Sequence, residues 1–198
     1  MSTVPVLSGE LLAVLESRWR TQGAVVARSL RPGLSDGQID EIAKPMGISL
    51  PAEARRWWGW HDGAFPLAPG RGPAEVGPGR PFLPLKEAVR VSMEIRGIMG
   101  GIWNGTLDPD WKHGFISLDG TELPPVIDCG VAFDQPVPVR AFPFQDPQAA
   151  TRGTRSIGEL VQLWIDAIDA GAWRYSRETE NWEYHLDKVD DFEVSDLL

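Results

Sequence analysis

Apolar positions near the start of the chain recur at helical spacing and predict two short helices. Between Ser8 and Gly23, leucines and a tryptophan recur every three or four residues, and the two end residues are typical of a helix start and a helix end. The second helix is predicted to begin at Ser35, with Gln38 in the capping-box position, and Pro45 is expected to stop it.

The stretch 50–63, L-P-A-E-A-R-R-W-W-G-W-H-D-G, predicts a third helix, and we expect the rest of the chain to be organised around it. Pro51 suits a first helical turn because its φ angle is preset, and Glu53 adds the negative charge that a helix dipole favours there. The helix is expected to run to about Trp60, and Gly63 is expected to close it in a left-handed conformation.

A change of composition follows. Residues 65–81 contain five prolines and four glycines, which predicts a surface loop without a regular β ladder. A short strand is then expected over residues 82–85. From Leu85 onwards the spacing of Ala88, Val89 and Met93 predicts an amphipathic helix.

The second half of the chain has the two-residue period of strands. Short β-branched or aromatic runs at 114–118, 125–129 and 137–142 are separated by turn residues, and consecutive strands of this kind favour an antiparallel meander. A helix is predicted from Ser156, which has Glu159 in the capping-box position. It is followed by a closing pair of strands, expected at 173–175 and 182–185.

Together these elements predict one α+β domain spanning residues 1–198. We expect a mixed or antiparallel sheet of about five to six strands, with helices packed mainly on one side of the sheet. Two decorations are predicted, namely the Pro/Gly-rich surface loop at 65–81 and an acidic C-terminal extension at 186–198.

Charge narrows the expected partners. The formal net charge is −9, and most of the excess acid lies after residue 177. Lys and Arg are scattered, so nucleic-acid binding is not expected, whereas an acidic end favours a partner with a basic surface. The sequence shows no secretory signal and no apolar run long enough to span a bilayer, so we expect a cytoplasmic protein that does not act on membranes.

Residue pairs with catalytic potential have simpler structural interpretations. His61 and Asp62, together with His185, resemble part of a metal-dependent hydrolase site, which we keep as an alternative; the preferred interpretation of His61 and Asp62 is a helix end. Cys129 is the single cysteine, which excludes an internal disulfide, and its setting favours a buried thiol over a nucleophile. No cofactor or metal site is predicted.

Two pairs of carboxylates come next. Asp108 with Asp110, and Asp119 with Glu122, are the paired carboxylates that glycosidase-type acid/base chemistry would require. All four stand among turn residues, where Asp commonly bonds its own backbone. The structural interpretation is therefore preferred, and no catalytic residue is predicted.

Tryptophan is the most unusual component of the sequence, with nine residues. Trp19, Trp58 and Trp164 lie on apolar helix stripes, which predicts a role in the core. Trp103 and Trp111 instead lie in a polar, glycine-rich segment. Tryptophan is enriched at interface hot spots, so these two are candidates for binding a partner.

Several segments together resemble the SUKH superfamily, which includes the Smi/Knr fungal cell-wall-assembly regulators and many bacterial immunity proteins. The similar segments, in the family's order, are P-G-L-S at 32–35, G-I-S-L-P-A-E-A-R-R-W-W-G-W-H-D-G at 47–63, F-L-P-L-K-E-A at 82–88, Trp111 with G-F-I-S-L-D-G at 114–120, Ile127-Asp128, and S-I-G-E-L at 156–160 before Gly171 and Trp173.

The resemblance implies an α+β fold, no catalytic residues and a role in binding other proteins. For bacterial members it implies neutralisation of a cognate toxin, often a nuclease. We therefore expect an immunity protein that binds a toxin domain with a basic surface; a regulatory or scaffold module is a further alternative. The candidate partner-binding residues are Trp103, Asp108, Asp110, Trp111, Glu183, Asp187, Asp190 and Asp191.

Overall fold

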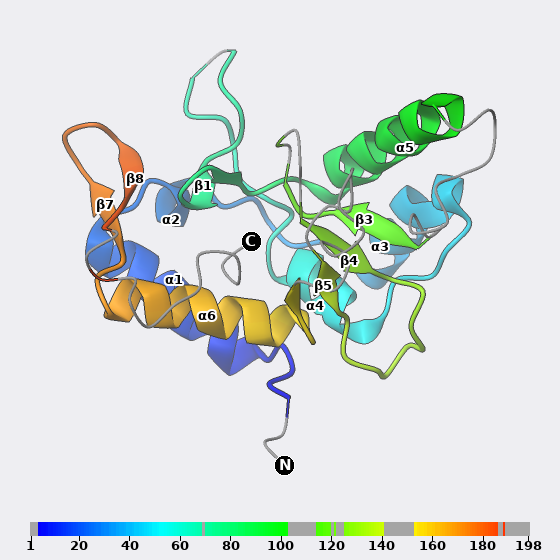
Figure 1. The fold of residues 1–198 in the computed structure, drawn as a ribbon, viewed down its shortest axis with the longest axis horizontal. Coiled ribbons are helices and arrows are strands. Elements are labelled where there is room, and N and C mark those ends of the chain that lie inside the picture. Colours follow the sequence, from blue (N-terminus) through cyan, green and yellow to red (C-terminus); the bar gives the residue numbers. More distant parts are fainter. Residues whose placement is uncertain are drawn as a thin grey trace.

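A computed structural model describes residues 4–68, 70–102, 114–119, 121, 125–140, 153–185 and 188. The helices are α1 (Gly9–Gln22), α2 (Val26–Ser29), α3 (Asp36–Ala43), the 3-10 turn η1 (Lys44–Met46), α4 (Ala52–Trp60), α5 (Leu85–Ile102) and α6 (Ile157–Asp169). The strands are β1 (Glu75–Gly77), β2 (Arg80–Pro81), β3 (Phe115–Ser117), β4 (Val126–Asp128), β5 (Val139–Arg140), β6 (Gly153–Thr154), β7 (Trp173–Ser176) and β8 (Asn181–Tyr184). The predicted α+β class is confirmed (Figure 1).

In the described parts of the chain, the strands form three antiparallel sheets. β3, β4, β5 and β6 pair in sequence order as a four-stranded meander, while β1 with β2 and β7 with β8 form separate pairs. The predicted meander and closing hairpin are confirmed, but among the described residues the largest sheet has four strands, not the five to six that were expected. The physical reason is that α6 follows β6 directly and carries the chain away before β7 begins (Figure 1).

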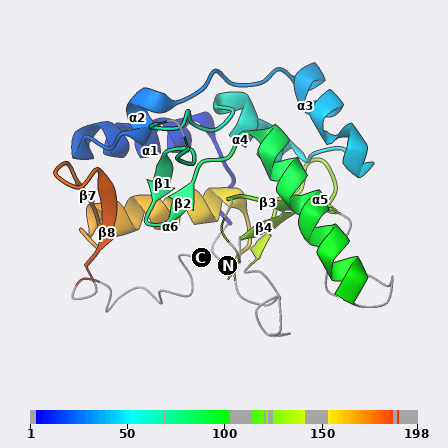
Figure 2. The ribbon, with the colours of Figure 1, turned by 90° about the horizontal axis from the view of Figure 1, so that it is seen from above.

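The helices are distributed between two ends of the molecule. α1 and α6 lie side by side and lead to the β7–β8 hairpin at one end. α3 and α5 lie together at the opposite end, where β3 also packs against α5 (Figures 1 and 2). This arrangement leaves α5, the longest helix of the described residues, projecting at the edge of the fold (Figure 2).

Local capping signals predicted the helix ends well. The Ser8 side chain accepts from a backbone N–H in the first turn of α1, and Gly23 closes that helix with φ +74°. Ser35 and Gln38 form the predicted capping box at α3. Ser156 caps α6. These interactions involve neighbours in sequence, which is why the sequence alone predicts them.

Tryptophans fill the core, as expected. Trp19, Trp58 and Trp164 are buried. Trp57 links two parts of this aromatic cluster, because its ring centroid lies 4.8 Å from that of Phe82 and 6.1 Å from that of Trp164. The helix in the stretch 50–63 is thus packed by aromatic side chains on the faces that it presents to α6 and to the segment before α5.

The Pro/Gly-rich segment 65–81 contains the β1–β2 ladder, which corrects the prediction of a loop without one. Indole N–H groups of Trp19 and Trp182 donate to backbone carbonyl oxygens of β1 at 3.0 Å each. Both donors come from elements remote in sequence, so composition gave no sign of them. The expected strand at 82–85 is also wrong, because Pro84 lacks an N–H and α5 begins at Leu85.

Glu53 connects three distant segments of the chain. Its side chain is only 2% exposed. One carboxylate oxygen accepts from the N–H groups of Leu7 (2.7 Å) and Gly158 (2.8 Å), and the other accepts from Val137 N–H (2.7 Å). The sequence predicts its place in the first turn of α4, but not that its side chain serves α6 and two further segments.

We expect Glu53→Gln to destabilise the fold by about 2–5 kcal/mol, because an amide group would set N–H donors against N–H donors in a buried site. Urea unfolding measures the change. Glu41→Gln is the matched control, since the Glu41 side chain is 76% exposed and its substitution should cost no more than about 0.5 kcal/mol. Equal effects of the two substitutions would contradict the assignment.

Gly158 allows the start of α6 to approach the N-terminal segment that Glu53 also binds. A Cβ at this position would overlap the backbone of Val6 and Leu7. We expect Gly158→Ala to destabilise by about 1–3 kcal/mol despite the better helix propensity of alanine. In α3, Gly37→Ala meets no neighbour within 4 Å and should stabilise by up to about 1 kcal/mol. Thermal unfolding of the two variants tests whether they change stability in opposite directions.

Candidate functional site

Most of the predicted partner-binding residues lie outside the described residues, namely Trp103, Asp108, Asp110, Trp111, Asp187, Asp190 and Asp191. Glu183 is described. It lies on β8 with an exposed side chain, and its carboxylate is 3.8 Å from the Nε2 atom of His185. The binding role of these residues stays a prediction.

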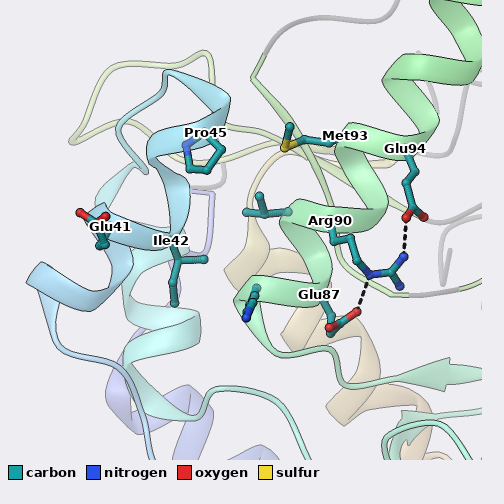
Figure 3. A pocket seen from close by; sticks show the side chains of 9 residues that line it. Glu41, Ile42, Pro45, Glu87, Arg90, Met93 and Glu94 are labelled. Carbon is teal, nitrogen blue, oxygen red and sulfur yellow. Dashed lines mark hydrogen bonds and ion pairs between the residues drawn. The ribbon is translucent and has the colours of Figure 1, made fainter.

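An apolar groove lies on the surface between α3 and α5. Its volume is about 640 Å³. Figure 3 shows the two helices as its walls, with Ile42 and Pro45 on one wall and Met93 on the other lying between them, while Glu41 and the Glu87–Arg90–Glu94 group lie at the outer sides. The lining residues are Glu41, Ile42, Pro45, Lys86, Glu87, Val89, Arg90, Met93 and Glu94.

The floor of the groove is formed by apolar side chains, some of which are only partly buried in the core. α3 buries Ile39 and Ala43 in the core, which leaves Ile42 half-buried on its flank. On α5, Val89 is buried and Met93, one turn later, is 44% exposed. A flexible thioether in this position can adapt to the shape of an incoming side chain.

Charged residues line the rim of the groove. On α5, Arg90 lies between Glu87 and Glu94 and donates to both, at 2.7 Å and 2.6 Å (Figure 3). These two hydrogen bonds raise the pKa of Arg90 above its usual value, so its charge is held. On the opposite wall Glu41 is mostly exposed, and the Nζ atom of Lys44 lies 3.6 Å from its carboxylate.

A second hollow, of about 680 Å³, lies on the other flank of α3 against α1 and α4. Phe133 is exposed at its edge, and the guanidinium of Arg55 lies 6.0 Å from the centre of that ring. Arg55 also donates to the carbonyl oxygen of Leu50 at 2.9 Å and pairs with Asp36 at 3.2 Å. Its donors are therefore used to hold α3 against α4.

His61 has structural partners. Its Nδ1 atom is 2.8 Å from the carbonyl oxygen of Arg31, and its Nε2 atom is 3.9 Å from a carboxylate oxygen of Glu16. Among the residues described, no group of three or more His, Cys, Asp and Glu side chains is placed to hold a metal ion.

Asp62 lies at the N-terminus of α5. It is 6% exposed, accepts from the N–H of Leu85 at 2.8 Å, and lies 3.5 Å from the guanidinium of Arg31. Gly63 has the predicted left-handed conformation, with φ +74°, but α4 already ends at His61 in an extended conformation. Gly63 instead lets the chain pass close to residues 82–84, which brings Asp62 to α5.

The other groups considered for catalysis are also held by local structure. Cys129 is buried, and burial, with a smaller contribution from Asp128, raises the pKa of its thiol far above the usual range. Asp119 accepts from the backbone N–H of Thr121 at 3.0 Å, as the turn interpretation predicts, and also pairs with Arg80 at 2.9 Å. Glu122 lies outside the described residues.

No protein-family model matches the chain, and no curated protein sequence matches it.

Within the described parts of the chain, no helix combines the length and the apolar character needed to cross a membrane.

The groove was not predicted from the sequence. Ile42 and Met93 belong to apolar helix stripes, and such a stripe predicts burial without saying what covers each position. The useful signal was on α5, where Glu87, Arg90 and Glu94 stand at i, i+3 and i+7 beside Met93. That spacing places a charged row next to the apolar row.

Burial makes Asp62 a source of pH dependence. Desolvation raises its pKa in the folded protein, against the opposing effects of the Leu85 N–H and Arg31. The stability that Asp62 contributes should therefore be greatest below its unfolded pKa of about 3.9 and should fall as pH rises through the folded value.

The Asp62→Asn variant has no titratable group at this position, so comparison with it isolates the contribution of Asp62 to the pH dependence of stability. We expect the unfolding free energy of the wild type, relative to Asp62→Asn, to decrease from about pH 4 upwards and then to level off. Urea unfolding of both proteins over this range measures it. A difference that stays constant or increases with pH would show that Asp62 is not desolvated as described.

Proposed function

We propose that this chain is a protein-binding protein of the toxin-immunity type, which neutralises a cognate toxin domain by binding to it. The observation that carries the proposal is the groove between α3 and α5, with its apolar floor and charged rim. An apolar hollow of this kind on the surface is a common feature of sites that bind another molecule.

The groove has the composition of a protein interface. Met93 and the partly buried Ile42 offer apolar area to solvent, and Arg90 pairs with two carboxylates on α5 beside Met93. Methionine and arginine are enriched at protein interfaces. A side chain of a partner that enters between α3 and α5 would bury the apolar floor and leave the charges at the rim.

Charge supports a basic partner. The chain has 28 acidic residues against 19 Lys and Arg residues. A nuclease toxin must attract a nucleic acid, so its cleft is basic, and an acidic protein is attracted to the same surface. Covering that cleft would exclude the substrate. The resemblance to immunity proteins of the SUKH superfamily supports the same function.

The helix that forms one wall of the groove, α5, leads directly into the segment that is predicted to bind a partner. α5 ends at Ile102, and Trp103 follows directly. An interface on α5 would therefore adjoin, along the chain, the segment that carries Trp103 and Trp111. The proposal joins the two as one binding region.

The proposal predicts that a toxin domain is encoded near this protein, and the direct test uses that domain. Isothermal titration of the purified pair should give a 1:1 complex with a nanomolar Kd, and addition of this protein should stop the toxin's activity at equimolar concentration. A regulatory module would instead leave the toxin active. Absence of binding to any neighbouring toxin domain would overturn the proposal.

The acidic end should act on the association rate. We expect reversal of Asp187, Asp190 and Asp191 to Lys to slow association about 5- to 20-fold at low salt, with a smaller effect at 0.5 M salt. Reversal of Glu10, Asp134 and Asp166 makes the same change in net charge elsewhere and is the control. Stopped-flow rates that fall equally in both triple variants would show that only net charge matters.

A further inference from the structure

The face of α5 that borders the groove continues beyond the groove itself. Lys86, Val89, Met93 and Gly97 recur every three or four residues, about one helical turn apart, and form one stripe, with Arg90 beside it. α5 has 18 residues and is about 27 Å long, whereas the eight residues of α3 span only about 12 Å. The stripe thus extends past the end of α3.

The solvent exposure of the stripe increases along α5. Val89 is buried where α3 and α5 approach each other, and Met93 is half-exposed one turn further on. At Gly97 a Cβ would meet nothing within 4 Å, so the surface there is open and has no side chain. A rod-like partner element could therefore approach the backbone of α5 closely at Gly97 while its side chains enter the groove at Met93.

Carboxylates lie on both sides of this stripe. Glu41 stands on the α3 wall, and Glu87 and Glu94 stand on the α5 wall. Arg90 is occupied by the two α5 carboxylates, and Lys44 contacts Glu41 only at 3.6 Å across the solvent-exposed surface. The lining of the groove thus contains three carboxylates and two cations, Lys86 and Arg90. The whole chain has a net charge of −9.

We infer that the groove between α3 and α5 receives an amphipathic helix of the partner, whose apolar stripe covers Ile42, Val89 and Met93 and whose flanking Lys or Arg side chains face Glu41 and Glu94. This inference rests on the proposed function and specifies the part of the partner that binds. A helix fits because both walls are helices, and a third helix packs against them through apolar residues at i, i+3, i+4 and i+7.

Two synthetic peptides test the chemistry without the toxin. Both are 18-residue helices with the same leucine stripe; in one the flanking positions are Lys and in the other they are Glu. Fluorescence anisotropy at 150 mM salt should show micromolar binding of the Lys peptide and at least tenfold weaker binding of the Glu peptide. Equal affinities, or no binding of either peptide, would overturn the inference.

Location is tested with two variants that make the same change in net charge. Met93→Arg blocks the groove, whereas Val14→Arg replaces a residue that is 38% exposed on α1. We expect Met93→Arg to weaken binding of the Lys peptide at least tenfold and Val14→Arg to change it less than twofold. Equal effects would assign the binding to net charge and reject the groove.

Thermal unfolding checks that Met93→Arg is folded. A second pair of variants tests the location of binding without relying on Met93→Arg. Glu41→Lys at the rim should weaken the Lys peptide about fivefold and strengthen the Glu peptide, whereas Glu10→Lys on α1 should leave both within twofold. If Glu41→Lys behaves as Glu10→Lys does, the rim carboxylates do not select the partner and the inference fails.

The toxin separates this inference from the proposed function. If the toxin binds the wild type and Met93→Arg equally, the function stands and the groove is not its docking site. If the Lys peptide binds in the groove while no neighbouring toxin domain binds the protein, the groove takes a basic helix and the immunity function fails.

Discussion

The buried carboxylate of Glu53 is the interaction on which the arrangement of the segments depends. It accepts three backbone N–H groups, from Leu7, Val137 and Gly158, which lie 46, 84 and 105 residues away in sequence. A buried charge is tolerated only where hydrogen bonds replace its hydration. The N-terminal segment, the chain before β5 and the start of α6 must therefore all be in place together, which couples local packing to the global fold.

α4 places a second carboxylate at its other end. Glu53 stands in the first turn and reaches the N-terminus of α6, while Asp62 follows the last turn and reaches the N-terminus of α5. At each N-terminus the carboxylate accepts from a backbone N–H group that has no partner within its own helix. The nine-residue helix α4 and the residue that follows its end thus hold the N-termini of two longer helices in place.

This distribution of interactions explains what the sequence could and could not predict. The caps at Ser8, Ser35 and Ser156 depend on neighbours three residues away, so pattern alone located α1, α3 and α6. The β1–β2 ladder depends on the indole of Trp19 more than 50 residues earlier and on that of Trp182 about 100 residues later. No local signal reports such partners, and composition therefore indicated a plain loop.

The same limit applied to the candidate site. Tryptophan and acid content directed attention to the segments after α5 and after β8, whereas the groove arises from the mutual placement of α3 and α5, two elements separated by α4 and the β1–β2 ladder. Periodicity placed Ile42 and Met93 on apolar stripes correctly. It could not show that no third element among the described residues covers them.

The groove is linked to the stretch 50–63 through α5. Asp62 holds the first N–H of α5 at 2.8 Å, and the hydroxyl of Ser92 accepts from the Ser117 N–H of β3 at 2.8 Å. One wall of the groove is thereby held at its start and again near Met93. A site held in place before its partner arrives loses less conformational entropy on binding. The hydrogen bond from Leu85 to Asp62 thus fixes the start of this wall, although burial of the same carboxylate raises its pKa and is expected to reduce stability as pH rises.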